Sequence, residues 1–206
     1  MSAPRPHDLL RITLPCSAIP VDAPAWVHQS LTRAPWVVVR RATAPPGHLA
    51  VGVRGNTRAH RYALTLPSTA VVKRVAPDEL NQVDLRAHRS LPAIEALRAI
   101  RPQVMATGLR WGPTGAVGFE LASGAPHVHP ASDLDLAVYV NDANAAVGQR
   151  LCALDRVLEN AMVRIDCQIE FPWGAIALAE ITSQAPHLLV RSATGPRLID
   201  AAALTP

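Results

Sequence analysis

Two aspartates in the middle of the chain have the type and spacing of a metal-binding pair. In the sequence SDLDLAVYV, Asp133 and Asp135 alternate with the apolar residues Leu134 and Leu136. Side chains two residues apart along a strand point to the same face, so an extended segment presents both carboxylates together. Two adjacent carboxylates repel each other unless a cation lies between them. The pattern therefore predicts a divalent cation with hard oxygen ligands, and Mg²⁺ suits such ligands best.

A third acid follows in the segment MVRIDCQIEF. Its alternation puts Asp166 and Glu170 on one polar face, opposite Ile165 and Cys167. Asp166 is thus presented in the same way as the aspartate pair, and we favour it over Glu170 as the third carboxylate of the site. The alternative for Asp166 is a solvated acid on an edge strand.

Three regularly spaced glycines precede the aspartate pair in the segment GPTGAVGFE. Gly112, Gly115 and Gly118 would let the backbone turn tightly, and the amide N–H groups of such a turn can hold phosphate oxygens. We therefore predict a glycine turn that leads to the aspartate strand within one hairpin. An isolated aspartate pair, or glycines alone, would say little. Their order, followed by a third acid on a later strand, resembles the signature of the nucleotidyltransferase superfamily.

The bulk composition is that of a globular chain. Its 206 residues are 49% hydrophobic, which suits one large domain or two small ones. The N-terminus lacks an apolar run after its first charges, and no later apolar stretch is long enough to span a bilayer, so we expect a soluble, cytoplasmic protein. Cys16, Cys152 and Cys167 are odd in number and widely separated, and we expect reduced, buried thiols.

The charges are unevenly distributed along the chain. Residues 1–80 carry ten basic and four acidic side chains, whereas the remainder carries ten basic and twelve acidic ones. All the basic residues except Lys73 are arginines, whose planar group binds phosphate and carboxylate in a bidentate way. A GC-rich genome would explain the same bias equally well. Aromatic residues make up only 4% and do not alternate with arginines, which argues against a nucleic-acid partner.

The first 80 residues are predicted to form a small, basic, β-rich domain. Apolar runs separated by proline and glycine indicate short strands at 7–14, 35–41, 48–55, 63–66 and 68–75. A helix is expected from about Pro24 to Arg33, and the APPG turn predicts a hairpin between the second and third strands.

Residues 81–206 are predicted to form the catalytic domain. The segment LPAIEALRAI repeats apolar residues every three positions from Leu91 to Ile100, which predicts an amphipathic helix capped by Ser90. NDANAAVGQRLCALDRVLENA is a second helix, and WGAIALAEIT is too short to assign as helix or strand. The order of elements implies an α+β fold with helices on one face of the sheet. The resemblance to the nucleotidyltransferase superfamily implies that this is a nucleotidyltransferase-like domain with a mixed sheet.

Several motifs together resemble the malonate decarboxylase holo-acyl-carrier-protein synthases, also called phosphoribosyl-dephospho-CoA transferases. The resemblance covers nearly the whole chain and is strongest in WGPTGAVGFELASG and SDLDL. It also includes HDLL, VVVRRA, VGVRGNTRAHR, IDCQIEFPWGAIALAE and GPRL. The long central motif is far more specific than an aspartate pair alone.

The resemblance implies a metal-dependent transfer to a protein. Such enzymes attach the prosthetic group of 2'-(5''-triphosphoribosyl)-3'-dephospho-CoA to a serine of the apo acyl carrier protein subunit of malonate decarboxylase and release pyrophosphate. Asp133 and Asp135 would hold Mg²⁺ against the triphosphate. Asp166 would complete a second metal position or accept the serine proton. Gly115 and nearby amides, including that of Gly118, would hold the departing phosphates.

One residue departs from the family pattern, whereas three arginines match that pattern. The family usually has serine where this chain has Ala116, so a hydroxyl contact to phosphate is missing, although the backbone amide can still donate. We expect weaker turnover with the site retained. Arg54, Arg58 and Arg61 match the family's VRG..R..R stretch and would suit a phosphate-rich substrate or an acidic carrier protein. A solvated basic loop is the alternative.

Two other functions stay open at the level of sequence. A generic nucleotidyltransferase would use an ordinary nucleoside triphosphate on another acceptor, because the three acids are common to that superfamily. A non-catalytic nucleotide-binding module would keep the fold without turnover. Turnover of ATP or CTP without a carrier protein would favour the first, and ligand binding without product would favour the second.

Overall fold

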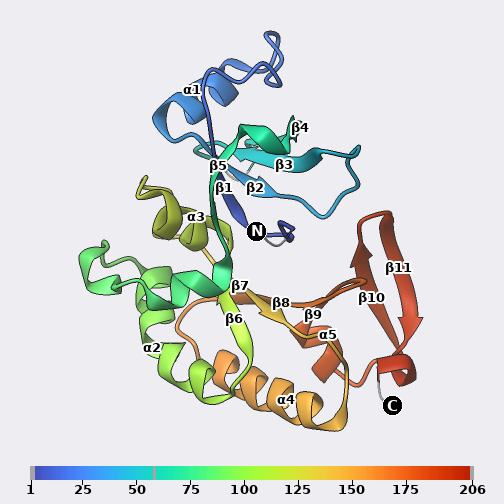
Figure 1. The fold of residues 1–206 in the computed structure, drawn as a ribbon. Coiled ribbons are helices and arrows are strands. Elements are labelled where there is room, and N and C mark those ends of the chain that lie inside the picture. The colour runs from blue at the N-terminus through green and yellow to red at the C-terminus, as the bar shows by residue number, and fades with distance from the viewer. Residues whose placement is uncertain (1–2, 58, 205–206) are drawn as a thin grey trace.

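The computed structural model describes residues 3–57 and 59–204, and its elements form two β-sheets with helices. A five-stranded antiparallel sheet is built from the N-terminal part of the chain, and a six-stranded mixed sheet from the rest (Figure 1). This arrangement confirms the predicted α+β class. The short 3₁₀ helices η2 (Pro77–Gln82) and η3 (Leu85–Ala87) carry the chain from the first sheet to the second.

The first sheet has the strand order β4-β3-β2-β1-β5. Its strands are β1 (Leu9–Ile12), β2 (Trp36–Val39), β3 (His48–Arg54), β4 (Arg61–Pro67) and β5 (Val71–Val75), with η1 (Ser68–Ala70) before the last. Helix α1 (Ala25–Arg33) covers one face with Val27 and Leu31, which are fully buried. The predicted helix near 24–33 and the β2–β3 hairpin are both confirmed.

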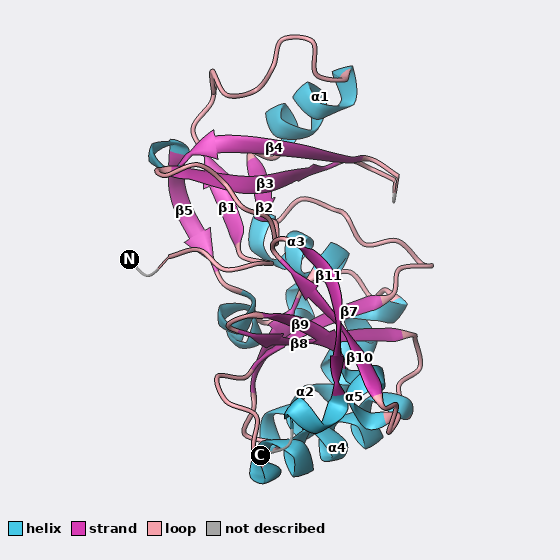
Figure 2. Cartoon of the chain, turned by 90° about the vertical axis from the view of Figure 1, so that its right-hand side faces the viewer, coloured by secondary structure: helices cyan, strands magenta, loops and turns pink. Residues whose placement is uncertain are grey.

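The second sheet has the strand order β11-β10-β9-β8-β7-β6, and among the strands that the structure describes in it only β7 and β8 are parallel. Its strands are β6 (Arg110–Pro113), β7 (Leu134–Tyr139), β8 (Ile165–Phe171), β9 (Gly174–Ala177), β10 (His187–Ser192) and β11 (Gly195–Asp200), followed by η4 (Ala201–Leu204). Helices α2 (Pro92–Ala106), α4 (Ala145–Glu159) and α5 (Leu178–Thr182) lie on the side away from the first sheet (Figures 1 and 2).

Helices α2 and α4 form where the apolar spacing and the end residues favour them. Pro92 occupies the first turn of α2, where its missing N–H costs no hydrogen bond. Leu91 is the N-cap, whereas Ser90, the predicted cap, donates a side-chain hydrogen bond to Glu95 instead. Asn144 caps α4 by accepting from the Val147 N–H group at 3.0 Å.

The predicted glycine turn is a helix. Residues Gly115–Ser123 form α3, which lies between β6 and β7 on the side that faces the first sheet (Figures 1 and 2). The strand β6, which contains Gly112, does pair antiparallel with β7, but a helix connects the two strands, so the expectation of a glycine turn between them was wrong. The segment AVGFELA contains mostly good helix formers, and a glycine at the first position accommodates a φ of +58°. The ambiguous segment 174–182 contains both β9 and the short helix α5.

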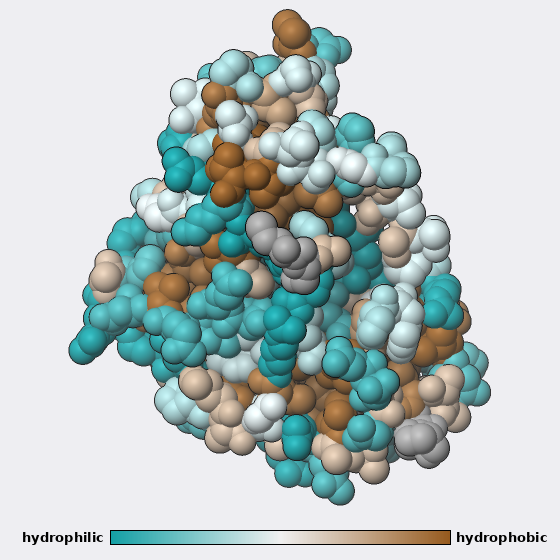
Figure 3. All heavy atoms as spheres, in the orientation of Figure 1, coloured by the Kyte–Doolittle hydropathy of each residue, from teal (hydrophilic) through white to brown (hydrophobic). Residues whose placement is uncertain are grey.

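The two sheets share part of their core. Leu9, Trp36 and Val75 of the first sheet pack in the same buried cluster as α2 and the second sheet. On the face seen in Figure 3, hydrophobic residues occur in separate patches among polar ones. Of the cysteines only Cys167 is buried, and Cys152 is exposed, so the expectation of three buried thiols was wrong. No helix within the described ranges is both long and apolar enough to cross a membrane.

Candidate active site

Two of the predicted acids lie side by side on the only parallel pair of strands in the described part of the second sheet. Asp135 of β7 is directly in register with Asp166 of β8, and on the opposite face Leu136 is in register with Cys167. Neighbouring strands lie about 4.8 Å apart, so the two carboxylates project together from one face. Gln168 Nε2 donates to Asp166 Oδ1 at 2.8 Å and fixes that carboxylate.

The N-terminus of α3 contacts Asp135. The Thr114 N–H group donates to the main-chain oxygen of Asp135 at 2.8 Å, and Thr114 forms no side-chain cap on the helix. The first amide N–H groups of a helix lack partners within it and attract anions. Thr114 and Gly115 line the same cleft as Asp135, and Gly115 lies against the Asp135 carboxylate, so the start of α3 borders the cleft.

Replacing Gly115 by alanine should distort this contact. A Cβ atom at position 115 would lie 1.6 Å from Asp135 Oδ2, and the backbone there has a φ of +58°. We expect Gly115→Ala to lower the free energy of unfolding by about 1–3 kcal/mol more than Gly124→Ala does. Gly124 is the matched control because its φ is +71° but a Cβ there meets nothing within 4 Å. Urea unfolding of both variants measures the difference, and equal losses would contradict the steric argument.

A cleft of about 830 Å³ lies between the two sheets, and we call it the carboxylate cleft. The second sheet contributes Asp135 and Asp166 to one wall, and the first sheet contributes Arg54 and Arg61 to the other. These arginines are in register on the β3–β4 hairpin, so they too present their side chains together. Acids on one wall and arginines on the other suit a ligand with phosphate groups that are bridged to the acids by a cation.

The structure brings together five of the residues predicted for the site: Gly115, Asp135, Asp166, Arg54 and Arg61. Asp133 lies just before β7 and does not line the cleft, and its role as a ligand stays a prediction. Ala116 is in the first turn of α3. Gly118 is buried, and a Cβ there would lie 2.6 Å from the Pro113 oxygen, so close packing of α3 on β6 explains this glycine. Arg58 is outside the described residues.

The carboxylate cleft fits Mg²⁺ better than it fits a metal held by protein ligands alone. Within residues 3–57 and 59–204, no three His, Cys, Asp or Glu side chains are grouped as a metal site. Mg²⁺ usually binds through one or two carboxylates, with substrate phosphates and water as its other ligands. Asp135 and Asp166 match that donor set, provided that a phosphate ligand completes it.

Glu170, the other candidate for the third acid, joins the two sheets instead. Its side chain is 5% exposed, and Arg41 Nη2 donates to both of its carboxylate oxygens. The His7 Nε2 atom lies 3.0 Å from Glu170 Oε1. Burial raises the pKa of Glu170, but the hydrogen bond and charge of His7 and the charge of Arg41 outweigh it, so the pKa lies below its usual value.

The loop between α3 and β7 is held by a buried acid. Glu120 Oε2 accepts hydrogen bonds from the His127 and Val128 N–H groups at 2.6 and 2.7 Å, and from Arg89 at 2.8 Å. The His127 ring is buried and lies 4.8 Å from the ring of Phe119. Glu120 is therefore a structural residue that fixes the approach to β7.

His127 should make the free energy of unfolding depend on pH between about 4 and 6.5. Burial lowers the pKa of His127 from 6.5 to about 4, and the positive charge of Arg54 adds to this effect. The unfolded chain takes up a proton near pH 6.5 that the folded protein excludes, so the free energy of unfolding falls as the pH decreases from about 6.5 to 4. We expect His127→Phe to weaken this dependence in urea unfolding, whereas His187→Phe, at an exposed position on β10, should retain it.

Gln168 and Arg40 are among the residues of the carboxylate cleft that were missed at the level of sequence. Gln168 has the same strand alternation as Asp166, so the pattern that selected the acid also contained its hydrogen-bond partner. Arg40 follows the buried strand β2 and lines the cleft from the first sheet. Charged residues directly after a buried strand are the signal that could have indicated Arg40.

Comparison with known proteins identifies similar chains over nearly the full length. Two family models match, described as the phosphoribosyl-dephospho-CoA transferase MdcG N-terminal domain, at residues 5–77, and C-terminal domain, at residues 79–202. The chain is 43% identical to a phosphoribosyl-dephospho-CoA transferase of Pseudomonas putida, over 97% of this chain and 95% of that protein. It is 41% identical to the protein of that name from Pseudomonas aeruginosa, over 97% and 93%, and 38% identical to that from Azotobacter vinelandii, over 95% and 92%. No solved structure matches the chain significantly.

Proposed function

We propose a reaction for this chain, which belongs to the phosphoribosyl-dephospho-CoA transferase family. It transfers the prosthetic group of 2'-(5''-triphosphoribosyl)-3'-dephospho-CoA to a serine of an apo acyl carrier protein. The acceptor we propose is the carrier subunit of malonate decarboxylase. One observation carries the mechanism, namely that Asp135 and Asp166 face Arg54 and Arg61 across a single cleft.

The arginines would bind the triphosphate of the donor. Their paired guanidinium groups match phosphate oxygens in geometry and charge. Opposite them, the amide groups at the start of α3 would donate to the leaving phosphates, and Ala116 would contribute its backbone N–H group there. The triphosphate would thus be held from both walls, with its α-phosphorus directed toward the carboxylates.

Asp135 and Asp166 would hold Mg²⁺, with Asp133 as a further candidate ligand. When bound, Mg²⁺ would neutralise charge on the triphosphate and on the transferred phosphoryl group. Gln168 keeps the Asp166 carboxylate oriented toward the cleft through its 2.8 Å hydrogen bond. This proposal needs no third protein ligand, because phosphate oxygens supply the remaining positions.

The transfer is a single displacement at phosphorus. The serine oxygen of the carrier forms a bond to the α-phosphorus, and the bond from that phosphorus to the bridging oxygen of the β-phosphate breaks. Pyrophosphate leaves with the bonding electron pair. The serine proton passes to solvent, with exposed Asp166 as the candidate base in the alternative in which it does not bind Mg²⁺. The product is a phosphodiester on the carrier.

We place this reaction in the cytoplasm. All three cysteines of the chain are free thiols, which is the usual state in a reducing compartment. The acceptor is a protein, and no nucleic acid or membrane takes part in the proposed reaction.

Intact mass spectrometry of the apo carrier protein tests this function. Incubation with the transferase, the donor and Mg²⁺ should add the mass of one phosphoribosyl-dephospho-CoA group, and EDTA should prevent the addition. A carrier whose acceptor serine is replaced by alanine is the control and should stay unmodified. A folded transferase that binds the donor yet gives no mass gain would refute the proposal, and turnover of ATP or CTP without the carrier would favour a generic nucleotidyltransferase.

A further inference from the structure

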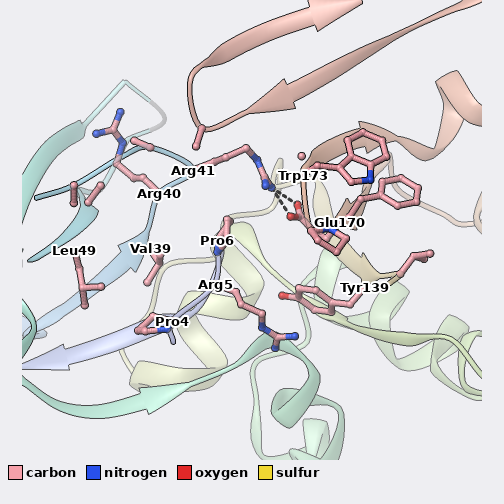
Figure 4. A pocket seen from close by; sticks show the side chains of 18 of the residues that line it. Pro4, Arg5, Pro6, Val39, Arg40, Arg41, Leu49, Tyr139, Glu170 and Trp173 are labelled. Carbon is pink, nitrogen blue, oxygen red and sulfur yellow. Dashed lines mark hydrogen bonds and ion pairs between the residues drawn. The ribbon is translucent and has the colours of Figure 1, made fainter. Parts of the chain in front are cut away.

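A second cavity of about 690 Å³ lies between the two sheets, and we call it the aromatic cavity. Figure 4 shows Trp173 and Tyr139 of the second sheet on one side of it, and Val39 and Leu49 of the first sheet on the other. Its volume falls in the range of small-molecule sites. Arg40 borders both the aromatic cavity and the carboxylate cleft, so the two spaces are neighbours.

The aromatic cavity is lined by a partly exposed indole ring. Trp173 lies in the turn between β8 and β9, and 40% of it is exposed. Its ring stacks on Phe171 with a centroid separation of 4.7 Å and an interplanar angle of 9°. The Arg197 guanidinium lies 5.7 Å from the indole centroid. Arg197 lies over the indole and is not among the residues that line the cavity, whereas the exposed part of the ring, backed by Phe171, offers a nucleobase a surface on which to stack.

The charge of the aromatic cavity suits phosphate. Arg5 and Arg110 both pair with Asp78, and Arg41 pairs with Glu170. Arg40 is exposed and, among the residues that the structure describes, has no acidic partner. Arg40 and the Trp173 ring line opposite sides of the same cavity, and a nucleotide needs these two kinds of contact for its phosphates and its base (Figure 4).

We infer that the aromatic cavity binds the adenosine diphosphate portion of the donor, with the base stacked on Trp173 and Arg40 in contact with phosphate. This assignment rests on the proposed function. The donor has two separate anionic groups, because its triphosphate is attached to the added ribose and its diphosphate belongs to dephospho-CoA. Two adjacent cavities that share one arginine match that division. The triphosphate would occupy the carboxylate cleft.

Calorimetric titration with 3'-dephospho-CoA, which lacks the triphosphoribosyl group, tests the assignment. Trp173→Leu should weaken binding about tenfold or more, because the stacking surface is lost, whereas Trp173→Phe keeps a ring and should stay within about threefold. Neither variant should change the affinity for tripolyphosphate with Mg²⁺, the probe of the carboxylate cleft. Arg40→Gln should weaken the binding of both ligands. Arg86→Gln, which changes an exposed ion pair on the surface, should weaken the binding of neither.

Equal affinity of the wild type and Trp173→Leu for dephospho-CoA would overturn the assignment. A wild-type protein that binds tripolyphosphate but not dephospho-CoA would overturn it as well. The proposed function fails in a different way, by a missing mass gain on the carrier. If dephospho-CoA binding depends on Trp173 and the carrier still stays unmodified, the cavity assignment stands and the transfer reaction does not.

Discussion

Asp135→Asn and Asp166→Asn should each reduce the rate of carrier modification by about 100-fold to 1,000-fold without unfolding the protein. Each substitution keeps the size of the side chain and removes one negative oxygen from the in-register pair on β7 and β8. The loss corresponds to a preorganised electrostatic contact that acts on charge in the transition state. A time course of the carrier mass at saturating donor measures the effect.

The matched control for these variants is Asp142→Asn. Asp142 is exposed in the loop after β7 and lines neither cavity, so its variant should modify the carrier at the wild-type rate. Thermal melting of all three variants checks that the fold is retained. Near-normal activity of either Asp135→Asn or Asp166→Asn would exclude that residue from the reaction, and raising the Mg²⁺ concentration should partly restore a variant that lost only metal affinity.

Glu170→Gln should cause the largest loss of stability, about 3–5 kcal/mol of the free energy of unfolding. The substitution removes the charge that Arg41 and His7 of the first part of the chain both contact, and it leaves the mostly buried Arg41 guanidinium without an anionic partner. Figure 4 shows that this contact spans the aromatic cavity from one sheet to the other. Urea unfolding measures the loss.

The same experiment has a control and a pH signature. Glu180→Gln removes an acid whose pairing with Arg191 is longer, 3.7 Å, and more exposed, so it should cost less than about 1 kcal/mol. Because the pKa of Glu170 is lowered in the folded protein, its contribution is present above about pH 4.5 and is lost as the pH falls below that value. The Glu170→Gln variant should lack this part of the acid dependence. A loss similar to that of Glu180→Gln would show that the bridge is dispensable.

The parts of the site that one strand determines could be predicted from the sequence. The alternation of SDLDL and of RIDCQ fixes which side chains share a face, because that depends only on local backbone geometry. The structure adds what no single segment contains, namely that β7 and β8 are parallel and that Asp135 pairs with Asp166. Pairing of distant strands depends on tertiary contacts, so the predicted order of elements could not give it.

The wrong predictions have identifiable causes. Gly112, Gly115 and Gly118 looked like a turn, but of these three only Gly115 has a positive φ, whereas Gly112 and Gly118 are required where other backbone segments approach closely. The sequence alone does not distinguish a glycine that is needed for a positive φ from one that is needed for close packing. The opposition of Arg54 and Arg61 to the acids was likewise hidden, since it depends on how the two sheets face each other. The division of the chain near residue 80 stays a prediction.

The direct pairing of Asp135 with Asp166 restricts which insertions and deletions the chain can tolerate. A one-residue insertion or deletion within β8 would exchange its two faces, so that an acid would enter the core and Cys167 would face the cleft. An insertion or deletion of two residues leaves each side chain on its original face of the sheet and only moves Asp166 along β7. The loop between α4 and β8 lies outside the ladder and can vary in length at little cost. Length variation among related chains should therefore be found in that loop and be absent, or come in pairs of residues, within the strand.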